Sequence, residues 1–178
     1  MKIDKIGLGG GCHWCTEAVF QSLKGVNKAE QGWISALGAE EFSEAILLYF
    51  DPEEISLKEL IEVHLYTHKS TSDHSMRKKY RSAVYTFSEN KRKQSQEIIL
   101  SFQPKFGHKL ITKVHPFKSF KPSPSDIQDY YKKNPSKPFC EKYIDPKLSL
   151  VAKLFETHID RNFWQFYPQR KYKTTARI

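Results

Sequence analysis

The sequence predicts a single α+β domain: a mixed sheet of the ferredoxin-like, split βαβ type, covered by helices and wrapped by a long irregular C-terminal segment. The main observation is the order of the apolar patterns, which is strand, helix, strand, strand, helix, strand, helix, strand. The first six follow the split βαβ arrangement. A second observation is the length of 178 residues, 39% hydrophobic and 28% charged, which suits one domain with a sizeable core.

The first two elements lie on either side of a glycine-rich turn. Residues 3–8 predict a short strand that runs into three consecutive glycines at 9–11. Residues 16–23 predict a helix because their apolar side chains recur at helical spacing, and Gly25 ends it.

Two strands and a capped helix follow. Residues 26–34 are a candidate strand, and residues 43–50 form a stronger one with a near-continuous apolar run. The polar segment 51–54 breaks this strand. Ser56 then predicts the start of a helix, because Glu59 three residues later completes a capping box.

The second half of the chain continues the alternation and then becomes irregular. The expected elements are a strand at 81–87, a helix at 88–102, a strand at 109–115 and a last helix at 148–160. Residues 116–146 are rich in proline, serine, lysine and aromatic residues, so we expect them to wrap around the domain with one short helix near 125–132.

Composition narrows the class of protein. A net charge of +9 and a pI near 9.4 suit nucleic-acid binding, but the usual nucleic-acid motifs are missing. No apolar run approaches the roughly 20 residues of a membrane span, and the N-terminal residues lack the apolar core of a signal peptide. We expect a cytoplasmic monomer whose three cysteines serve catalysis or metal binding rather than structural disulfides.

The most informative segment runs from the three glycines through Cys12. A cysteine at the start of a helix lies among unpaired backbone N–H groups, at the positive end of the helix dipole. That environment favours the thiolate, which is the nucleophilic form. Glycines before it let the backbone turn sharply and leave the sulfur open to a substrate. The segment therefore predicts a reactive thiol.

Several motifs resemble the methionine sulfoxide reductase A family in the same order along residues 3–146. They are Gly-Cys-His-Trp at 11–14 with Glu17, Gln31-Gly32-Trp33, Ser43-Glu44-Ala45-Ile46, Tyr80-Arg81-Ser82-Ala83, and the late set of Asp126, Gln128, Tyr130, Asn134, Pro135 and Cys140. The resemblance implies a reductase-like catalytic domain over residues 1–147, followed by a helix and a basic, aromatic tail over 148–178.

The resemblance implies a mechanism for reducing methionine S-sulfoxide, free or in an oxidised protein. Cys12 would attack the sulfoxide sulfur, while Glu44 as an acid and Tyr80 as a donor bind its oxygen. Trp14 would form a wall of the pocket for the methyl group. Cys12 would become a sulfenic acid, which Cys140 would convert to a disulfide for thioredoxin or another thiol to reduce. No bound cofactor and no metal is implied.

The sequence departs from the family pattern at the substrate pocket. His13 replaces a phenylalanine that contacts the methyl group, and the loop that carries a second oxygen-binding tyrosine is missing between Trp33 and Glu44. Ile127 replaces a histidine. Asp73 is the candidate for an aspartate that the family has before Tyr80, although its register differs by two residues.

Three alternatives remain open from the residues alone. Cys15 follows Cys12 in a C-x-x-C pair, so it is a second candidate for the resolving thiol. His64, His68 and His74 could hold zinc or iron together with the two cysteines, or one of the last two could replace the lost hydrogen-bond donor. The same fold could also bind a sulfoxide or thioether without turnover.

Overall fold

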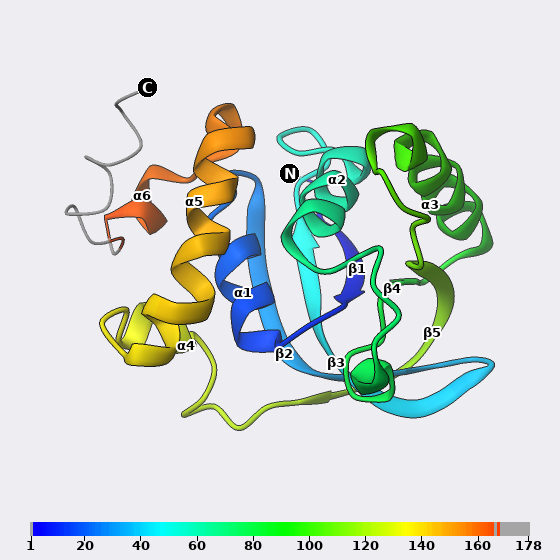
Figure 1. The fold of residues 1–178 in the computed structure, drawn as a ribbon, viewed down its shortest axis with the longest axis horizontal. Helices are drawn as coiled ribbons and strands as arrows, with labels where there is room; N and C mark the ends of the chain where they lie inside the picture. The colour runs from blue at the N-terminus through cyan, green and yellow to red at the C-terminus, as the bar shows by residue number, and fades with distance from the viewer. Residues whose placement is uncertain (1, 166, 168–178) are drawn as a thin grey trace.

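The strands form a closed five-stranded barrel in the computed structural model, which describes residues 2–165 and 167 (Figure 1). They are β1 (Asp4–Gly9), β2 (Val26–Ala36), β3 (Ala39–Phe50), β4 (Ala83–Thr86) and β5 (Lys113–Pro122). The order around the barrel is β1-β3-β2-β5-β4, and every neighbouring pair is antiparallel except β4 and β5. The expected mixture of helices with a mixed sheet is confirmed.

The ferredoxin-like description is not confirmed, because β5 closes the sheet. Its residues 113–116 pair with β4, and its residues 117–122 pair with β2. The sequence predicts this strand at 109–115 with irregular chain from Pro116 onward, whereas the strand runs on to Pro122. Pro116 lies where β5 changes partner, a position at which the missing N–H of a proline is tolerated.

The interior of the barrel is closely packed. A Cβ added to Gly7 would lie 2.7 Å from Ile34 Cδ1 and 2.9 Å from Tyr85 Cβ. Because β1 and β2 are not neighbours, the approach of Gly7 to Ile34 crosses the interior. The alanines at 36, 45 and 83 complete this inner cluster. Alternation along each strand directs the other face of the sheet outward to the helices.

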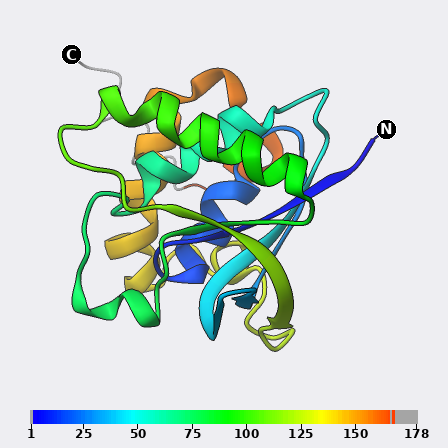
Figure 2. The same ribbon diagram turned by 90° about the vertical axis from the view of Figure 1, so that its right-hand side faces the viewer.

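The helices are α1 (His13–Gln21), α2 (Leu57–Thr67), α3 (Glu89–Phe102), α4 (Tyr130–Lys133), α5 (Asp145–Leu154) and α6 (Arg161–Trp164). The predicted capping box of α2 is present, with Ser56 and Glu59 exchanging both hydrogen bonds. Ser88 caps α3 by accepting from the N–H of Lys91. Figure 2 shows α2 and α3 together on one side of the barrel.

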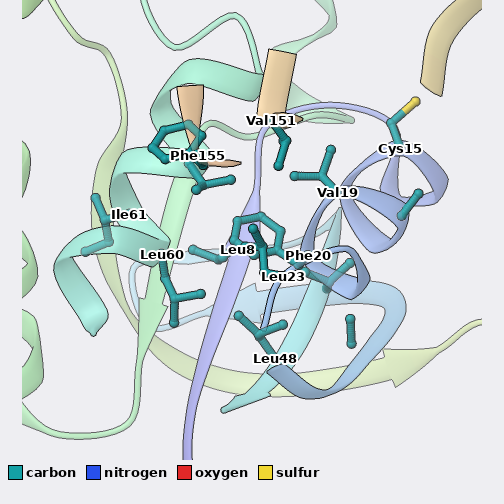
Figure 3. Packing of buried hydrophobic residues seen from close by; sticks show 14 of the residues in the cluster. Leu8, Cys15, Val19, Phe20, Leu23, Leu48, Leu60, Ile61, Val151 and Phe155 are labelled. Carbon is teal, nitrogen blue, oxygen red and sulfur yellow. The ribbon is translucent and has the colours of Figure 1, made fainter. Parts of the chain in front are cut away.

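The main hydrophobic core lies between the outer face of the barrel and the helices (Figure 3). Leu8 of β1, Phe20 of α1, Leu60 of α2 and Val151 of α5 are all fully buried within it. Burying a side chain of this size contributes about 1.5–3 kcal/mol. This packing fixes α1, and with it the cysteine that precedes α1.

The C-terminal segment packs on the barrel domain through α1. Trp164 Nε1 donates to the carbonyl oxygen of Ser22 over 3.1 Å, and Leu23 forms a bridge with Ile159. The helix expected at 148–160 begins at Asp145 and ends at Leu154, so the expected division after residue 147 falls within α5. Of the basic, aromatic tail expected after this helix, residue 166 and residues 168–178 lie outside the described residues. No helix in the described part of the chain has the length and apolarity to cross a membrane.

Candidate active site

Cys12 occupies the residue directly before α1, where the glycine turn meets the helix. Its thiol is partly buried, and its carbonyl oxygen accepts from the N–H groups of Cys15 and Thr16, each over 3.1 Å. A hydrogen bond from the Cys15 thiol lowers the pKa of Cys12, and the backbone N–H groups of Cys15 and Trp14 lower it further. Burial and the charge of Glu44 oppose this effect. The balance favours the thiolate.

Cys15 is the partner that stabilises this thiolate. Its pKa is raised, first because it donates its S–H to Cys12 and second because it is buried. Cys15 Sγ also lies 3.9 Å from the carbonyl oxygen of Tyr143, which can accept the same hydrogen. The pair thus holds one thiolate and one thiol at the start of α1.

The glycine turn lies against the partly buried ring of His68. A Cβ on Gly10 would lie only 2.3 Å from His68 Cδ2, so a side chain there would displace the ring. The Nε2 atom of His64 contacts the carbonyl oxygen of Gly9 over 2.8 Å, and His68 Nε2 contacts Ser82 Oγ over 2.8 Å. Burial lowers the pKa of His64 to about 4 and also lowers that of His68. Both rings are therefore neutral packing elements near pH 7.

A cavity of about 550 Å³ opens beside Cys12. Its walls come from four segments: the glycine turn, the end of α2, the loop before β4 and the turn that leads into α5. The lining residues are Gly10, Gly11, Cys12, Cys15, His68, Lys69, His74, Ser75, Met76, Tyr80, Phe139, Tyr143 and Lys147. Of the predicted site residues, Cys12 and Tyr80 line this cavity, and so do the two histidines considered as replacement donors.

Glu44 lies near Cys12 but outside the cavity wall. Its carboxylate is buried, and Oε2 accepts from the backbone N–H of His13 over 3.2 Å. His13 Nε2 lies 3.9 Å from the same oxygen, and Lys79 Nζ lies 3.5 Å from Oε1. The Glu44 carboxylate therefore lies between the ammonium group of Lys79 and the imidazole of His13.

His13 and Trp14 point into packed surroundings. His13 is buried, its Nδ1 lies 2.8 Å from the carbonyl oxygen of Gly32, and its ring meets Trp33 edge-on at 5.1 Å. Trp14 stacks on Tyr130 with ring centroids 4.2 Å apart and meets Phe139 edge-on. The substrate contacts expected of both residues stay predictions.

The loop before β4 is held by a residue that the sequence analysis did not single out. Arg77 donates to the carbonyl oxygens of Gly10 over 2.9 Å and of Tyr80 over 2.8 Å. This side chain ties the Tyr80 loop to the glycine turn. In the sequence it belongs to a basic run, which is typical of a solvated surface. Asp73, in the same loop, is exposed.

Cys140 lies in a π-helical turn, Cys140–Ile144, directly before α5. Its side chain is fully buried, and Sγ lies 3.5 Å from the carbonyl oxygen of Asn134. Cys12 and Cys15 are free thiols. Burial raises the pKa of Tyr130, and charge on each of the three thiols raises it further. The three sulfurs therefore lie within electrostatic reach of one tyrosine.

Lys147 is a second residue that the sequence analysis missed. It lines the cavity, and its ammonium donates to the carbonyl oxygen of Thr67. Burial lowers the pKa of Lys147, and negative charge on Cys15 and Cys12 opposes that effect. Lys147 is the third residue of α5, and no local sequence pattern marks it as a site residue. Only the packing of α5 on α1 brings it close to the thiols.

The ligand cluster required by the metal-binding alternative does not form. Among the described residues, no group of three or more histidine, cysteine, aspartate or glutamate side chains is placed to hold a metal ion. The ring nitrogens of His68 and the Nε2 atom of His64 are already engaged by protein oxygens. This arrangement gives no support to a metal centre built from the cysteines and histidines.

Comparison with known proteins agrees with this geometry. Residues 4–159 match the profile of the family described as peptide methionine sulfoxide reductase. Peptide methionine sulfoxide reductase MsrA of Deinococcus radiodurans is 34% identical over 169 residues, covering 85% of this chain and 81% of that protein. Mxr1 from Saccharomyces cerevisiae in an unusual oxidised form superposes with a TM-score of 0.62 at 26% identity, over 76% of this chain and 84% of that chain. Mxr1 in complex with Trx2 superposes with a TM-score of 0.56 at 25% identity, over 72% and 85% of the two chains. The chain belongs to the peptide methionine sulfoxide reductase family.

Proposed function

We infer that this chain reduces the S epimer of methionine sulfoxide to methionine, with Cys12 as the nucleophile. The observation that carries the proposal is the lowered pKa of Cys12, set by the Cys15 thiol and two backbone N–H groups beside an open cavity. A neutral packing cysteine would have neither the donors nor the access. The reaction itself is that of the family to which the chain belongs.

The first step transfers the sulfoxide oxygen from the methionine sulfur to the sulfur of Cys12. The Cys12 thiolate attacks the sulfoxide sulfur, and the oxygen takes up a proton as charge grows on it. The thioether of methionine leaves, and Cys12 keeps the oxygen as a sulfenic acid. We assign the acid role to Glu44 and a hydrogen bond to the oxygen to Tyr80, which lines the cavity with Cys12.

The surroundings of Glu44 place donors beside its carboxyl group. Oε2 accepts from the backbone N–H of His13 over 3.2 Å, and Lys79 Nζ lies 3.5 Å from Oε1. The His13 ring, whose Nδ1 contacts the carbonyl oxygen of Gly32, has its Nε2 3.9 Å from Oε2. We propose that this buried carboxyl group is the one that gives a proton to the sulfoxide oxygen.

A second thiol must then attack the sulfenic sulfur, releasing water and forming a disulfide. We propose Cys140 for this role on the basis of its place in the family pattern. Its complete burial means that the turn at 140–144 has to open first. Cys15 is the competing candidate, and a specific observation favours it: its thiol already hydrogen-bonds Cys12.

We propose that thioredoxin, or another dithiol, returns the disulfide to thiols. The support is the relative crystallised with Trx2, together with the absence of any need for a bound cofactor in thiol chemistry. A cytoplasmic location and a monomeric state are further parts of the proposal. The free thiols of Cys12 and Cys15 suit a reducing compartment.

Single-turnover measurements on cysteine variants test this assignment. One equivalent of S-sulfoxide peptide, given to prereduced protein without further reductant, should yield one methionine with wild type and with Cys140→Ser. Cys12→Ser should yield none. With thioredoxin added, Cys140→Ser should stop after one turnover, while the matched Cys15→Ser should continue to cycle. Continued cycling by Cys140→Ser and arrest of Cys15→Ser would transfer the resolving role to Cys15. Methionine formation by Cys12→Ser would overturn the proposal.

A further inference from the structure

A methionine of this chain lies in the wall of its own candidate active site. Met76 is 50% exposed and lines the same cavity as Cys12 and Tyr80. The chain has two methionines, and the other, Met1, lies outside the described residues. An exposed thioether is the group that peroxides convert to methionine sulfoxide. The enzyme therefore presents a precursor of its substrate at the cavity that holds its nucleophile.

The backbone that carries Met76 is fixed against the glycine turn. The N–H of Met76 donates to His74 Nδ1 over 3.2 Å, and its carbonyl oxygen accepts from the N–H of Tyr80 over 3.0 Å. The next residue, Arg77, donates to the carbonyl oxygen of Gly10, two residues before Cys12. The anchored turn keeps Met76 in the cavity wall, and the three rotatable bonds of its unbranched side chain leave the sulfur free to move.

We propose that Met76 is an internal substrate: once oxidised, its S-sulfoxide is reduced by Cys12 of the same chain. This inference rests on the proposed reductase function. Because Met76 belongs to the same chain, its sulfoxide is present at the cavity without a binding step. Its repair is therefore intramolecular and independent of protein concentration.

The steps balance for a peroxide as the oxidant and a dithiol as the reductant. The peroxide transfers one oxygen atom to the sulfur of Met76 and leaves as water or an alcohol. Cys12 then takes that oxygen as a sulfenic acid and restores the thioether. A second thiol attacks the sulfenic sulfur, water leaves, and the resulting disulfide accepts two electrons and two protons from the dithiol. Each cycle consumes one peroxide and one dithiol, and Met76 is regenerated.

The test follows the Met76 peptide by mass spectrometry. Wild type and Cys12→Ser are treated with limited hydrogen peroxide, cleared with catalase and incubated with dithiothreitol. We expect the S-sulfoxide of Met76 to disappear from wild type with a first-order rate that does not change on tenfold dilution. The R-sulfoxide should remain, and Cys12→Ser should keep both epimers.

Two controls separate the inference from the proposed function. The same oxidised wild-type sample is assayed on an external S-sulfoxide peptide, so loss of Cys12 or failure of the reductase proposal is seen directly. Leu100→Met places a methionine on α3 at a 70% exposed position outside the cavity wall. Its sulfoxide should be repaired only between molecules, at a rate that rises with concentration. Persistence of Met76 S-sulfoxide in a sample active on the peptide, or a dilution-dependent repair rate like that of the control site, would overturn the inference.

Discussion

At Cys12, two sets of interactions act on one ionisation. Burial and the nearby charge of Glu44 raise the pKa of the thiol, while the Cys15 thiol and two backbone N–H groups lower it. The lowering set prevails because hydrogen bonds to a charged acceptor are each worth about 1.5–3 kcal/mol. The hydrogen bond from the Cys15 thiol is the largest of these influences. In the reduced protein, the second cysteine of the C-x-x-C pair therefore stabilises the thiolate of the first.

Removing the Cys15 thiol should raise the pKa of Cys12. In a Cys140→Ser background, we expect Cys15→Ala to move the pH midpoint of Cys12 alkylation by iodoacetamide upward. The sign follows from the loss of a donor that favours the thiolate. The measurement is the alkylation rate of the Cys12 peptide across pH, compared with Cys140→Ser alone. An unchanged or lower midpoint would show that the helix N–H groups alone set the pKa.

The position of Cys12 could be predicted from the sequence, whereas the contacts of Arg77 and Lys147 could not. Cys12 is marked by local features, namely three glycines before it and a helix after it, so its position at the helix start could be predicted. Arg77 and Lys147 reach the site only through the fold. Their contacts with Gly10 and Thr67 join segments that are tens of residues apart, and no local pattern encodes such a contact.

At the scale of elements, a buried carboxylate joins α1 to the chain before α4. Glu17 accepts from the N–H of Asp129 over 2.8 Å and of Tyr130 over 3.1 Å, and from Gln31 Nε2 over 2.9 Å. Asp129 has a left-handed backbone (φ 57°), which this carboxylate stabilises by accepting its N–H. The contact also positions Tyr130, on which Trp14 stacks.

Glu17 makes stability depend on pH in a direction opposite to that of most carboxylates. Burial raises the pKa of Glu17 from 4.5 to about 7, so between these values the folded state holds a proton that the unfolded state has released. Stability therefore falls as pH rises through this window, by about 3 kcal/mol in total. We expect Glu17→Gln, which cannot ionise, to lack this component.

Urea unfolding at pH 4 to 8 measures this pH-dependent contribution of Glu17 to the free energy of unfolding. The free energy of unfolding of wild type minus that of Glu17→Gln should decrease as pH rises. An increase with pH would mean that Glu17 is stabilised as the carboxylate by its three donors. Comparing the pH dependence rather than the absolute stability removes the constant effect of the altered hydrogen bonds.

Element order could be predicted, whereas barrel closure could not. Strands and helices alternate as the sequence indicates, and the capping box of Ser56 and Glu59 fixes the start of α2. Closure depends on β5 pairing with β4 over its first half and with β2 over its second. Pro116 at the change of partner looks like a strand end in the sequence. Long-range pairing, rather than local propensity, decides that segment.

Across the whole molecule, the proposed site residues lie on separate segments that pack on the barrel. Cys12 follows β1, Glu44 lies on β3, Tyr80 lies in the loop before β4, and Cys140 precedes α5. The family match over residues 4–159 covers all four segments. The fold accommodates His13 because its ring is buried against Trp33 and its Nδ1 contacts the carbonyl oxygen of Gly32.

The central claim is that Cys12 reduces methionine S-sulfoxide despite His13 and the shortened loop. The most direct measurement is reduction of the separate S and R epimers of a methionine sulfoxide peptide with dithiothreitol, for wild type and Cys12→Ser. We expect wild type to turn over the S epimer alone and Cys12→Ser to turn over neither. Turnover of neither epimer by wild type, or activity that survives in Cys12→Ser, would overturn the assignment of Cys12.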